Sequence, residues 1–177
     1  ATELRGRADA DDDKKIAVWK YSLDEAAHTY LEITFRKSAK VRIAIEEALE
    51  LEKYARATAG VFLAWAALRG LLDEARLAKH AGVLAEMKAR RATGTQLFDA
   101  LGRGLWSDHL VNDAALRLHA YGYFHNMGSW ITTDLKNVFG KRPGPHGHDE
   151  PKLDDATWEA VDQASSVLDK QFARWLK

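Results

Sequence analysis

Residues 29–45 read TYLEITFRKSAKVRIAI, and two different periods fit this stretch. Apolar and polar side chains alternate over residues 31–36 and again over residues 41–45, and a period of two with β-branched residues is typical of strands. A second set of side chains recurs every three or four positions, as on one face of a helix. These residues are Tyr30, Thr34, Ser38, Val41, Ile45 and Ala48. The fold class depends on which period the chain adopts.

The surrounding sequence favours the helix. From residue 23 to residue 92 the chain contains no Pro and only three Gly, and it is rich in residues of high helix propensity. A hairpin would need RKSAK as its turn, which lacks the Gly, Asn or Asp that tight hairpin turns prefer. Ser22 and Glu25 in SLDE have the spacing of a capping box, which predicts a helix start at Ser22. We expect a helix over residues 30–45, with the hairpin as the alternative.

Glycine residues divide the long helical region. Gly60 and Gly70 are the expected positions of a bend or a turn, because glycine lowers helix stability. The segments ATGTQ and GRG, which contain Gly94 and Gly102, predict that the region ends there.

Two more helices and a loop are expected in the C-terminal part. The first helix is predicted over residues 107–139, with Ser107 as its cap and Leu110 on its apolar side. Residues 141–151, KRPGPHGHDEP, contain all three Pro and predict a loop. The second helix is predicted over residues 154–176. Its apolar stripe is Trp158, Val161, Ser165, Leu168, Phe172 and Trp175.

These elements predict an all-α fold. Residues 1–21 form an extended N-terminal arm, since they begin with a charged segment that has no hydrophobic period. Residues 22–92 form a long bent helical region. Residues 93–177 complete a bundle of four to five helices, in one domain with residues 22–92.

The composition indicates a folded protein of one domain. The chain has 177 residues, 46% of them hydrophobic, and six Trp. The longest apolar run, residues 57–68, is shorter than the roughly 18 residues that a membrane span needs. Residues 1–15 are polar and charged, so no secretory signal is expected there. The absence of Cys excludes disulfides, thiol catalysis and cysteine-ligated metal.

Charge is balanced overall but not along the chain. The 26 basic residues equal the 26 acidic ones, so no field of the whole chain attracts nucleic acid. Residues 51–103 carry nine Lys and Arg against five Asp and Glu, whereas residues 104–177 carry eight against ten. The sequence therefore predicts a local excess of positive charge.

Two groups of residues have the types of side chain that metals prefer. Glu25 and His28 form an ExxH pair, which di-iron bundles use twice but which occurs here once. His146 and His148, with the acidic residues that follow in HGHDE, have metal-binding side chains in a Pro- and Gly-rich loop that would not preorganise them. We expect no metal or other cofactor at either place.

Arg76 and His80 suggest an alternative function. In this pair, and in the predicted arrangement of helices, the chain resembles HEPN domains, small helical bundles that cleave RNA with an Arg followed by four to six residues and a His. RLAKH leaves three residues between Arg76 and His80, which departs from that spacing. The resemblance implies acid and base catalysis at a ribose hydroxyl. A helical adaptor that binds other proteins is a further alternative.

Basic residues along the long helical region predict a different role, the tracking of a phosphate backbone. Arg36, Lys37, Lys40 and Arg42 form the densest group. Lys53, Arg56, Arg69, Arg76, Lys79, Lys88, Arg90 and Arg91 continue it, with acidic residues interleaved. Ile33 and Ile43 lie off the predicted apolar face, which suggests that they contact a partner subunit.

This layout of arm, long helices and bundle resembles the helical major capsid proteins of filamentous archaeal viruses, which wrap double-stranded DNA in A form. The resemblance covers the whole chain as an architecture. It implies that phosphate contacts come first from Arg36, Lys37, Lys40 and Arg42, and on the arm from Arg5, Arg7, Lys14 and Lys15. The acidic residues Asp9 and Asp11 to Asp13 would pair with a neighbouring subunit instead.

The sequence thus predicts a structural protein rather than an enzyme. It would be a subunit of a filament in the virion, cytoplasmic before assembly. Its partners would be double-stranded DNA, other coat subunits of the same or a paralogous kind, and a lipid envelope where one is present. Recognition would be of DNA shape and backbone, without base reading.

Overall fold

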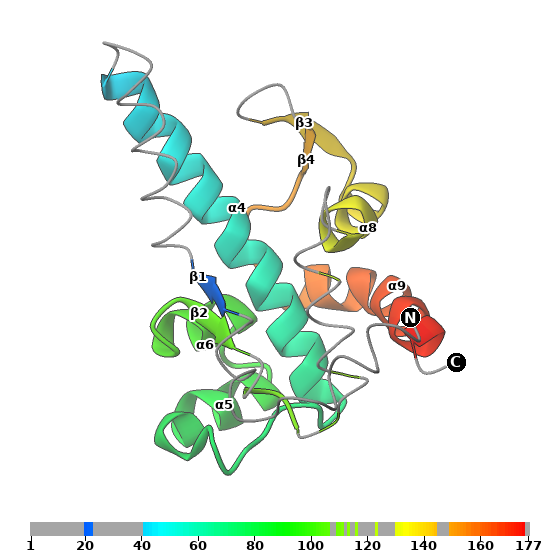
Figure 1. Ribbon diagram of the computed structural model, residues 1–177. Coiled ribbons are helices and arrows are strands. Elements are labelled where there is room, and N and C mark those ends of the chain that lie inside the picture. Colours follow the sequence, from blue (N-terminus) through cyan, green and yellow to red (C-terminus); the bar gives the residue numbers. More distant parts are fainter. Residues whose placement is uncertain are drawn as a thin grey trace, which may run out of the picture.

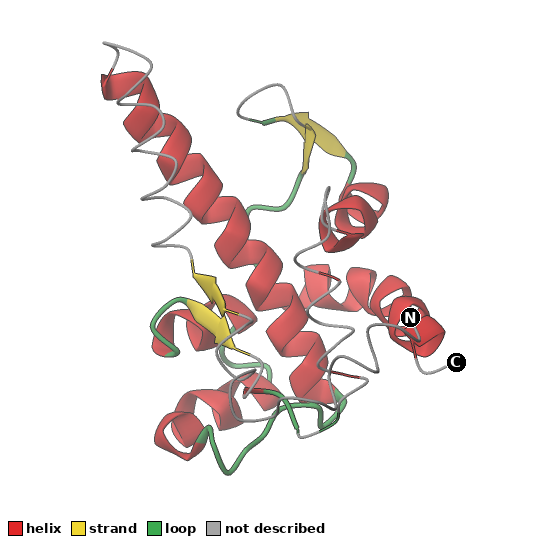
Figure 2. Ribbon diagram, viewed as in Figure 1, coloured by secondary structure: helices red, strands yellow, loops and turns green. Residues whose placement is uncertain are grey.

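A computed structural model describes residues 20–22, 41–106, 109–111, 113, 116, 123, 130–144 and 149–175. The α-helices in this part are α4 (Val41–Leu68), α5 (Ala81–Lys88), α6 (Gly94–Ala100), α8 (Trp130–Phe139) and α9 (Trp158–Trp175), and the 3-10 helix η1 (Ala78–His80) precedes α5. The strands are β1 (Lys20–Ser22), β2 (Gly104–Trp106), β3 (Lys141–Pro143) and β4 (Asp149–Pro151). The described part is mostly helical, with two small pairs of strands (Figure 2).

The centre of the fold is α4. Its side chains from Ala57 to Ala67 are all buried, and a helix buried on every side is a core helix. Figure 1 shows α5 and α6 on one side of α4, and α8 and α9 on the other. The apolar run that was too short for a membrane span is thus the core helix. Among the described helices, none has the length and apolar character that crossing a bilayer requires.

Within the stretch at residues 29–45, the predicted helix is confirmed for residues 41–45. Residues 41–45 lie in α4, so the second strand of the alternative hairpin is wrong. Residues 29–40 lie outside the described part, as do Glu25 of the predicted capping box and residues 1–19 of the predicted arm. Ser22 is the last residue of β1, which pairs antiparallel with β2.

The predicted bend at Gly60 is wrong, and the turn at Gly70 is confirmed. The helix α4 continues through Gly60 because this residue lies at a close crossing with α6, where a Cβ atom would come within 2.6 Å of the backbone nitrogen of Thr95. Gly70 has a φ of +65°, and the N–H of Leu71 donates to the carbonyl of Ala66 at 2.9 Å. This hydrogen bond closes α4 with a Schellman motif.

The helix predicted over residues 107–139 does not include Leu110. The backbone of Leu110 forms an isolated bridge with Leu72, and the N–H of Val111 donates to the carbonyl of Leu71 at 2.9 Å. These backbone groups pair with the turn after α4, so they are not available to a helix. Residues 130–139 form α8, and Ser107 lies outside the described residues.

The loop predicted over residues 141–151 contains a hairpin instead, so an all-α fold is not correct in detail. Strands β3 and β4 pair antiparallel, with Arg142 opposite Glu150. Each strand has three residues, and Pro143 and Pro151 lie at strand ends, where a missing N–H is tolerated. Proline content alone had predicted a loop.

The last helix begins at Trp158, four residues later than predicted. Thr157 accepts a hydrogen bond from the N–H of Ala160 at 3.2 Å, which makes it the cap. The predicted apolar stripe is largely confirmed, because Val161 and Leu168 are fully buried and Trp158, Ser165 and Phe172 are half-buried.

Three aspartates spaced seven residues apart attach this C-terminal segment to the rest of the fold. Asp155 accepts a hydrogen bond from Thr95 of α6 at 2.7 Å. Asp162 forms a bidentate ion pair with Arg90, in which each carboxylate oxygen lies 2.8 Å from a guanidinium nitrogen. Asp169 pairs with Arg69 and accepts from the indole N–H of Trp65 at 3.0 Å. Asp162 and Asp169 lie seven residues apart on α9, a spacing that keeps them on one helix face, whereas Asp155 lies in the segment before the helix.

Candidate functional site

The structure places only one of the residues predicted to contact DNA. Arg42 lies in the first turn of α4. The other seven lie outside the described residues: Arg5, Arg7, Lys14, Lys15, Arg36, Lys37 and Lys40. Figure 1 shows that the N-terminal end of α4 reaches beyond the other described helices. The contact of Arg42 with DNA stays a prediction.

Most of the basic residues that continue this group are paired with carboxylates. The pairs are Lys53–Asp154, Arg56–Asp99, Arg69–Asp169, Arg76–Asp73, Lys88–Glu74, Arg90–Asp162 and Arg91–Glu86. Three of the carboxylates belong to the acidic C-terminal part, so most of the local excess of positive charge is neutralised within the fold. A paired cation must exchange its carboxylate before it can bind phosphate.

Arg76 and His80 lie on a turn and on η1 rather than along one α-helix. Arg76 pairs with Asp73 at 3.6 Å, and its N–H also donates to that carboxylate at 3.1 Å. The ribonuclease alternative stays a prediction. Glu25, His28, His146 and His148 lie outside the described residues. Within the described part of the chain, no three His, Cys, Asp or Glu side chains are grouped as metal ligands.

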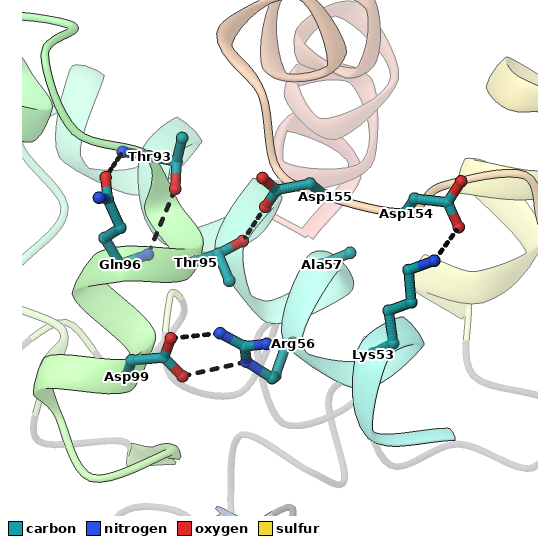
Figure 3. A pocket seen from close by; sticks show the side chains of 9 residues that line it. All are labelled: Lys53, Arg56, Ala57, Thr93, Thr95, Gln96, Asp99, Asp154 and Asp155. Atoms are coloured by element: carbon teal, nitrogen blue, oxygen red, sulfur yellow. Dashed lines mark hydrogen bonds and ion pairs between the residues drawn. The ribbon is translucent and has the colours of Figure 1, made fainter. Parts of the chain in front are cut away.

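A cleft of 510 Å³ lies where α4, α6 and the segment before α9 meet (Figure 3). Its volume is in the range of sites that receive a small molecule or a long side chain. Its lining is charged and polar apart from one alanine: Lys53, Arg56, Ala57, Thr93, Thr95, Gln96, Asp99, Asp154 and Asp155.

The wall from α6 is fixed by a capping box. The hydroxyl of Thr93 accepts from the N–H of Gln96 at 3.3 Å, and the side chain of Gln96 accepts from the N–H of Thr93 at 2.7 Å. Gly94 lies between them in direct contact with the backbone of Gly60 on α4. The first turn of α6 therefore holds a fixed position above the core helix.

Two ion pairs connect the walls of the cleft. Lys53 of α4 lies 3.1 Å from Asp154, which also pairs with Arg142 of β3 at 2.6 Å. Hydrogen bonds from Arg142 and Lys53 hold the pKa of Asp154 below its usual range. Arg56 pairs with Asp99 of α6 through two hydrogen bonds, and Arg103 approaches the same carboxylate at 3.4 Å. Each of these carboxylates thus has two cations.

Asp155 differs from the other two carboxylates of the cleft. Its Oδ1 accepts from the hydroxyl of Thr95 at 2.7 Å and from the N–H of Ala156 at 2.8 Å. Both donors are neutral. Among the described residues, Asp155 has no ion pair with Lys, Arg or His. The cleft therefore contains one exposed negative charge that is oriented by hydrogen bonds but not neutralised.

A second group of polar side chains holds α8 in place. The hydroxyl of Tyr123 donates to Asp134 of α8 at 2.8 Å, and both side chains are buried. Burial and this hydrogen bond raise the pKa of Tyr123. The hydroxyls of Tyr54 and Thr132 are also hydrogen-bonded, and burial raises the pKa of Tyr54. These tyrosines stay protonated at neutral pH and bind α8 to the core.

Comparison with protein families gives a match over much of the chain. Residues 24–145 match the model of a family described as DUF7832, a domain of unknown function. The chain belongs to this family. The DUF7832 match includes α4 and α6 but ends before Asp154 and α9. No curated protein and no solved structure matches the chain.

The sequence analysis did not identify the cleft, although part of it has a signal. TGTQ at residues 93–96 has the capping-box spacing of Thr93 and Gln96, which could have placed a helix start there. The two ion pairs that connect the walls, Lys53–Asp154 and Arg56–Asp99, join residues at least 43 positions apart, and no local pattern predicts such pairs.

Proposed function

We propose that this protein is a non-enzymatic binding domain that recognises another protein through the cleft between α4 and α6. The observation that carries the proposal is the charged lining of the cleft, whose side chains are fixed in position by ion pairs between its walls. Fixed charges favour recognition, because little entropy is lost when a partner binds them.

The ionisation of the cleft also supports binding over acid and base catalysis. A general acid or base needs a pKa close to the working pH. The pKa of Asp154 is instead held below its usual range by Arg142 and Lys53, so its carboxylate is ionised at neutral pH and is a weak base. Such a group suits an interface of complementary charge.

Site-specific photocrosslinking tests this function. A p-benzoylphenylalanine at Lys53, on the cleft, is compared with one at Lys170, an exposed residue of α9 outside the lining. In cells that express the full chain, we expect a discrete protein adduct from position 53 and none from position 170. The partner, purified, should then bind the wild type in solution. Equal labelling at both positions, or none at position 53, would contradict the proposal.

The DNA-wrapping coat subunit is the second candidate. What favours it is Arg42, a member of the densest basic group, at the end of α4 that reaches beyond the other described helices (Figure 1). In this case the protein would assemble with double-stranded DNA and with other copies or paralogues of itself in a virion. An envelope would be a further partner.

Light scattering after size-exclusion chromatography distinguishes the two candidates. A coat should form large complexes with double-stranded DNA that dissolve at ~0.5 M salt, because phosphate contacts weaken steeply with salt. Arg42→Ala should weaken this binding equally for all DNA sequences. A species of constant size with and without DNA would remove the coat from consideration.

A further inference from the structure

We infer that the cleft receives a basic side chain of the partner protein, an arginine guanidinium or a lysine ammonium, and that Asp155 pairs with it. This inference rests on the function proposed above and adds the chemistry of the partner. It assigns a binding role to Asp155 that the sequence pattern does not indicate.

The pairing of the individual carboxylates carries the inference rather than the total charge, because with Arg103 and Arg142 the cations around the cleft outnumber the carboxylates. Two cations and three carboxylates line it. Lys53 forms an ion pair with Asp154, and Arg56 forms one with Asp99. Asp155 is therefore the charged residue of the described lining that has no counterion. Arg142 and Arg103 add a second cation to each of the other two carboxylates, so those sites are already satisfied.

The geometry of Asp155 suits a charged ligand. Thr95 and Ala156 both donate to Oδ1, so the carboxylate is held in place by one oxygen. Among the described residues, none donates a hydrogen bond to Oδ2, the other oxygen of Asp155. A cation at Oδ2 would form a charge-assisted hydrogen bond, which is about twice as strong as a neutral one. A guanidinium could at the same time donate to the side chain of Gln96 or Thr95 on the neighbouring wall.

NMR titration with small probes tests the cation site without the partner. N-acetyl-L-argininamide is added to the ¹⁵N-labelled full chain, and the amide signals of Thr95, Gln96 and Ala156 are followed. We expect saturable shifts. The neutral isostere N-acetyl-L-citrullinamide should bind with an affinity at least about tenfold lower, because the loss of one charge-assisted contact corresponds to about a tenfold change in affinity. The inference would be overturned if citrullinamide bound with the same affinity as argininamide. It would also be overturned if an acidic probe, the α-amide of N-acetyl-L-glutamate, bound more tightly than argininamide.

Two variants locate the charge. Asp155→Asn keeps an oxygen that can accept from Thr95 and Ala156 while removing the charge, so the fold should persist. It should lower the affinity for argininamide about tenfold. Glu159→Gln removes an exposed charge in the first turn of α9, outside the lining, and should leave that affinity within about twofold. An affinity unchanged in Asp155→Asn would overturn the inference.

A measurement on the wild type keeps the test independent of variant folding. Raising NaCl from ~0.05 to ~0.5 M shortens the screening length several-fold and should weaken argininamide binding. Binding insensitive to salt would count against a charge contact. The two proposals fail separately: a partner captured at position 53 that binds Asp155→Asn normally overturns the cation site alone. Argininamide binding at Asp155 without any captured protein overturns the protein partner and leaves only a cation site at Asp155.

Discussion

Gly60 on α4 and Gly94 at the start of α6 are in direct backbone contact. A Cβ atom at Gly94 would lie 1.8 Å from the carbonyl oxygen of Gly60. The obstructing atom belongs to the backbone of a buried helix, so it cannot rotate away as a side chain could. This contact sets how closely the two walls of the cleft approach each other.

Gly94→Ala should therefore destabilise the protein strongly. The added methyl group must push α6 away from the core helix, and overpacking against backbone costs about 3 kcal/mol. Urea unfolding followed by circular dichroism measures the loss in the free energy of unfolding. The cleft should widen as well, which the NMR signals of Thr95 and Gln96 would report.

Gly82→Ala is the matched control for this change. Gly82 lies in the first turn of α5, where a Cβ atom would meet nothing within 4 Å. Alanine has the higher helix propensity, so this variant should gain about 0.5 kcal/mol. If both variants changed stability alike, the backbone contact at Gly94 would not be limiting.

Arg90 combines a strained backbone with two side-chain contacts. Its φ is 60°, in the left-handed region that favours glycine, and it follows the end of α5 in a Schellman motif. Its guanidinium pairs with Asp162 and lies 4.9 Å from the ring centre of Trp158. The indole N–H of Trp158 in turn donates to the carbonyl of Ala92 at 2.9 Å. The contacts of its side chain, rather than its backbone conformation, therefore explain why an arginine occupies this position.

Substitutions at Arg90 separate these two contributions. Arg90→Ala removes the contacts and keeps the strain, whereas Arg90→Gly removes both. Arg90→Ala should therefore be less stable than Arg90→Gly, by about 1 kcal/mol for a left-handed residue. Thermal unfolding of both variants measures the difference. Arg91→Ala, which removes only an exposed pair with Glu86, should change little. Equal stability of the alanine and glycine variants would mean that the backbone strain is relieved in another way.

Local patterns predicted the central helix and most of the last helix, but not how the helices pack. The central helix and the apolar stripe of α9 could be read from spacing, because a helix face repeats within four residues. Gly60 was read as a bend because glycine weakens a helix, yet its role is to allow a neighbour to approach. That role depends on Gly94, 34 positions away in the sequence, and no local pattern contains it.

The basic residues show the same limit for function. A row of cations along a helix predicted contacts with phosphate, and the carboxylates that neutralise Arg69 and Arg90 lie on α9. Only the fold brings these charges together. For the cleft, the proposed cation site depends on Asp155 having no counterion among the described residues. This depends on which carboxylates pair with the other cations, and those pairs exist only in the folded chain.

Tyr123→Phe should lower stability by about 2 kcal/mol. The change removes the donor to Asp134 and leaves a buried carboxylate short of one hydrogen bond, and such bonds to charged groups contribute about 1.5–3 kcal/mol. Urea unfolding measures the loss. Tyr54→Phe removes a bond between two neutral hydroxyls and should cost about 1 kcal/mol. A larger loss for Tyr54→Phe would place the stronger contact at Thr132.

Acid should weaken the attachment of α9. Hydrogen bonds from Arg69 and Trp65 keep the pKa of Asp169 low, and those from Arg90 do the same for Asp162. The unfolded chain has an aspartate pKa of about 3.9 and binds protons at a higher pH than the folded chain does. The stability from these pairs is therefore complete above that pKa. It is lost as the pH falls through the lowered pKa of the folded state.

Asp169→Asn tests this pH dependence. The variant keeps an acceptor for Trp65 and Arg69 but does not titrate, so its free energy of unfolding should fall less steeply than that of the wild type between about pH 5 and pH 3. Urea unfolding at several pH values measures both slopes. Glu159→Gln, whose exposed carboxylate contacts Gln163, should keep the slope of the wild type. If Asp169→Asn had the same slope as the wild type, acid sensitivity would have to come from carboxylates away from α9.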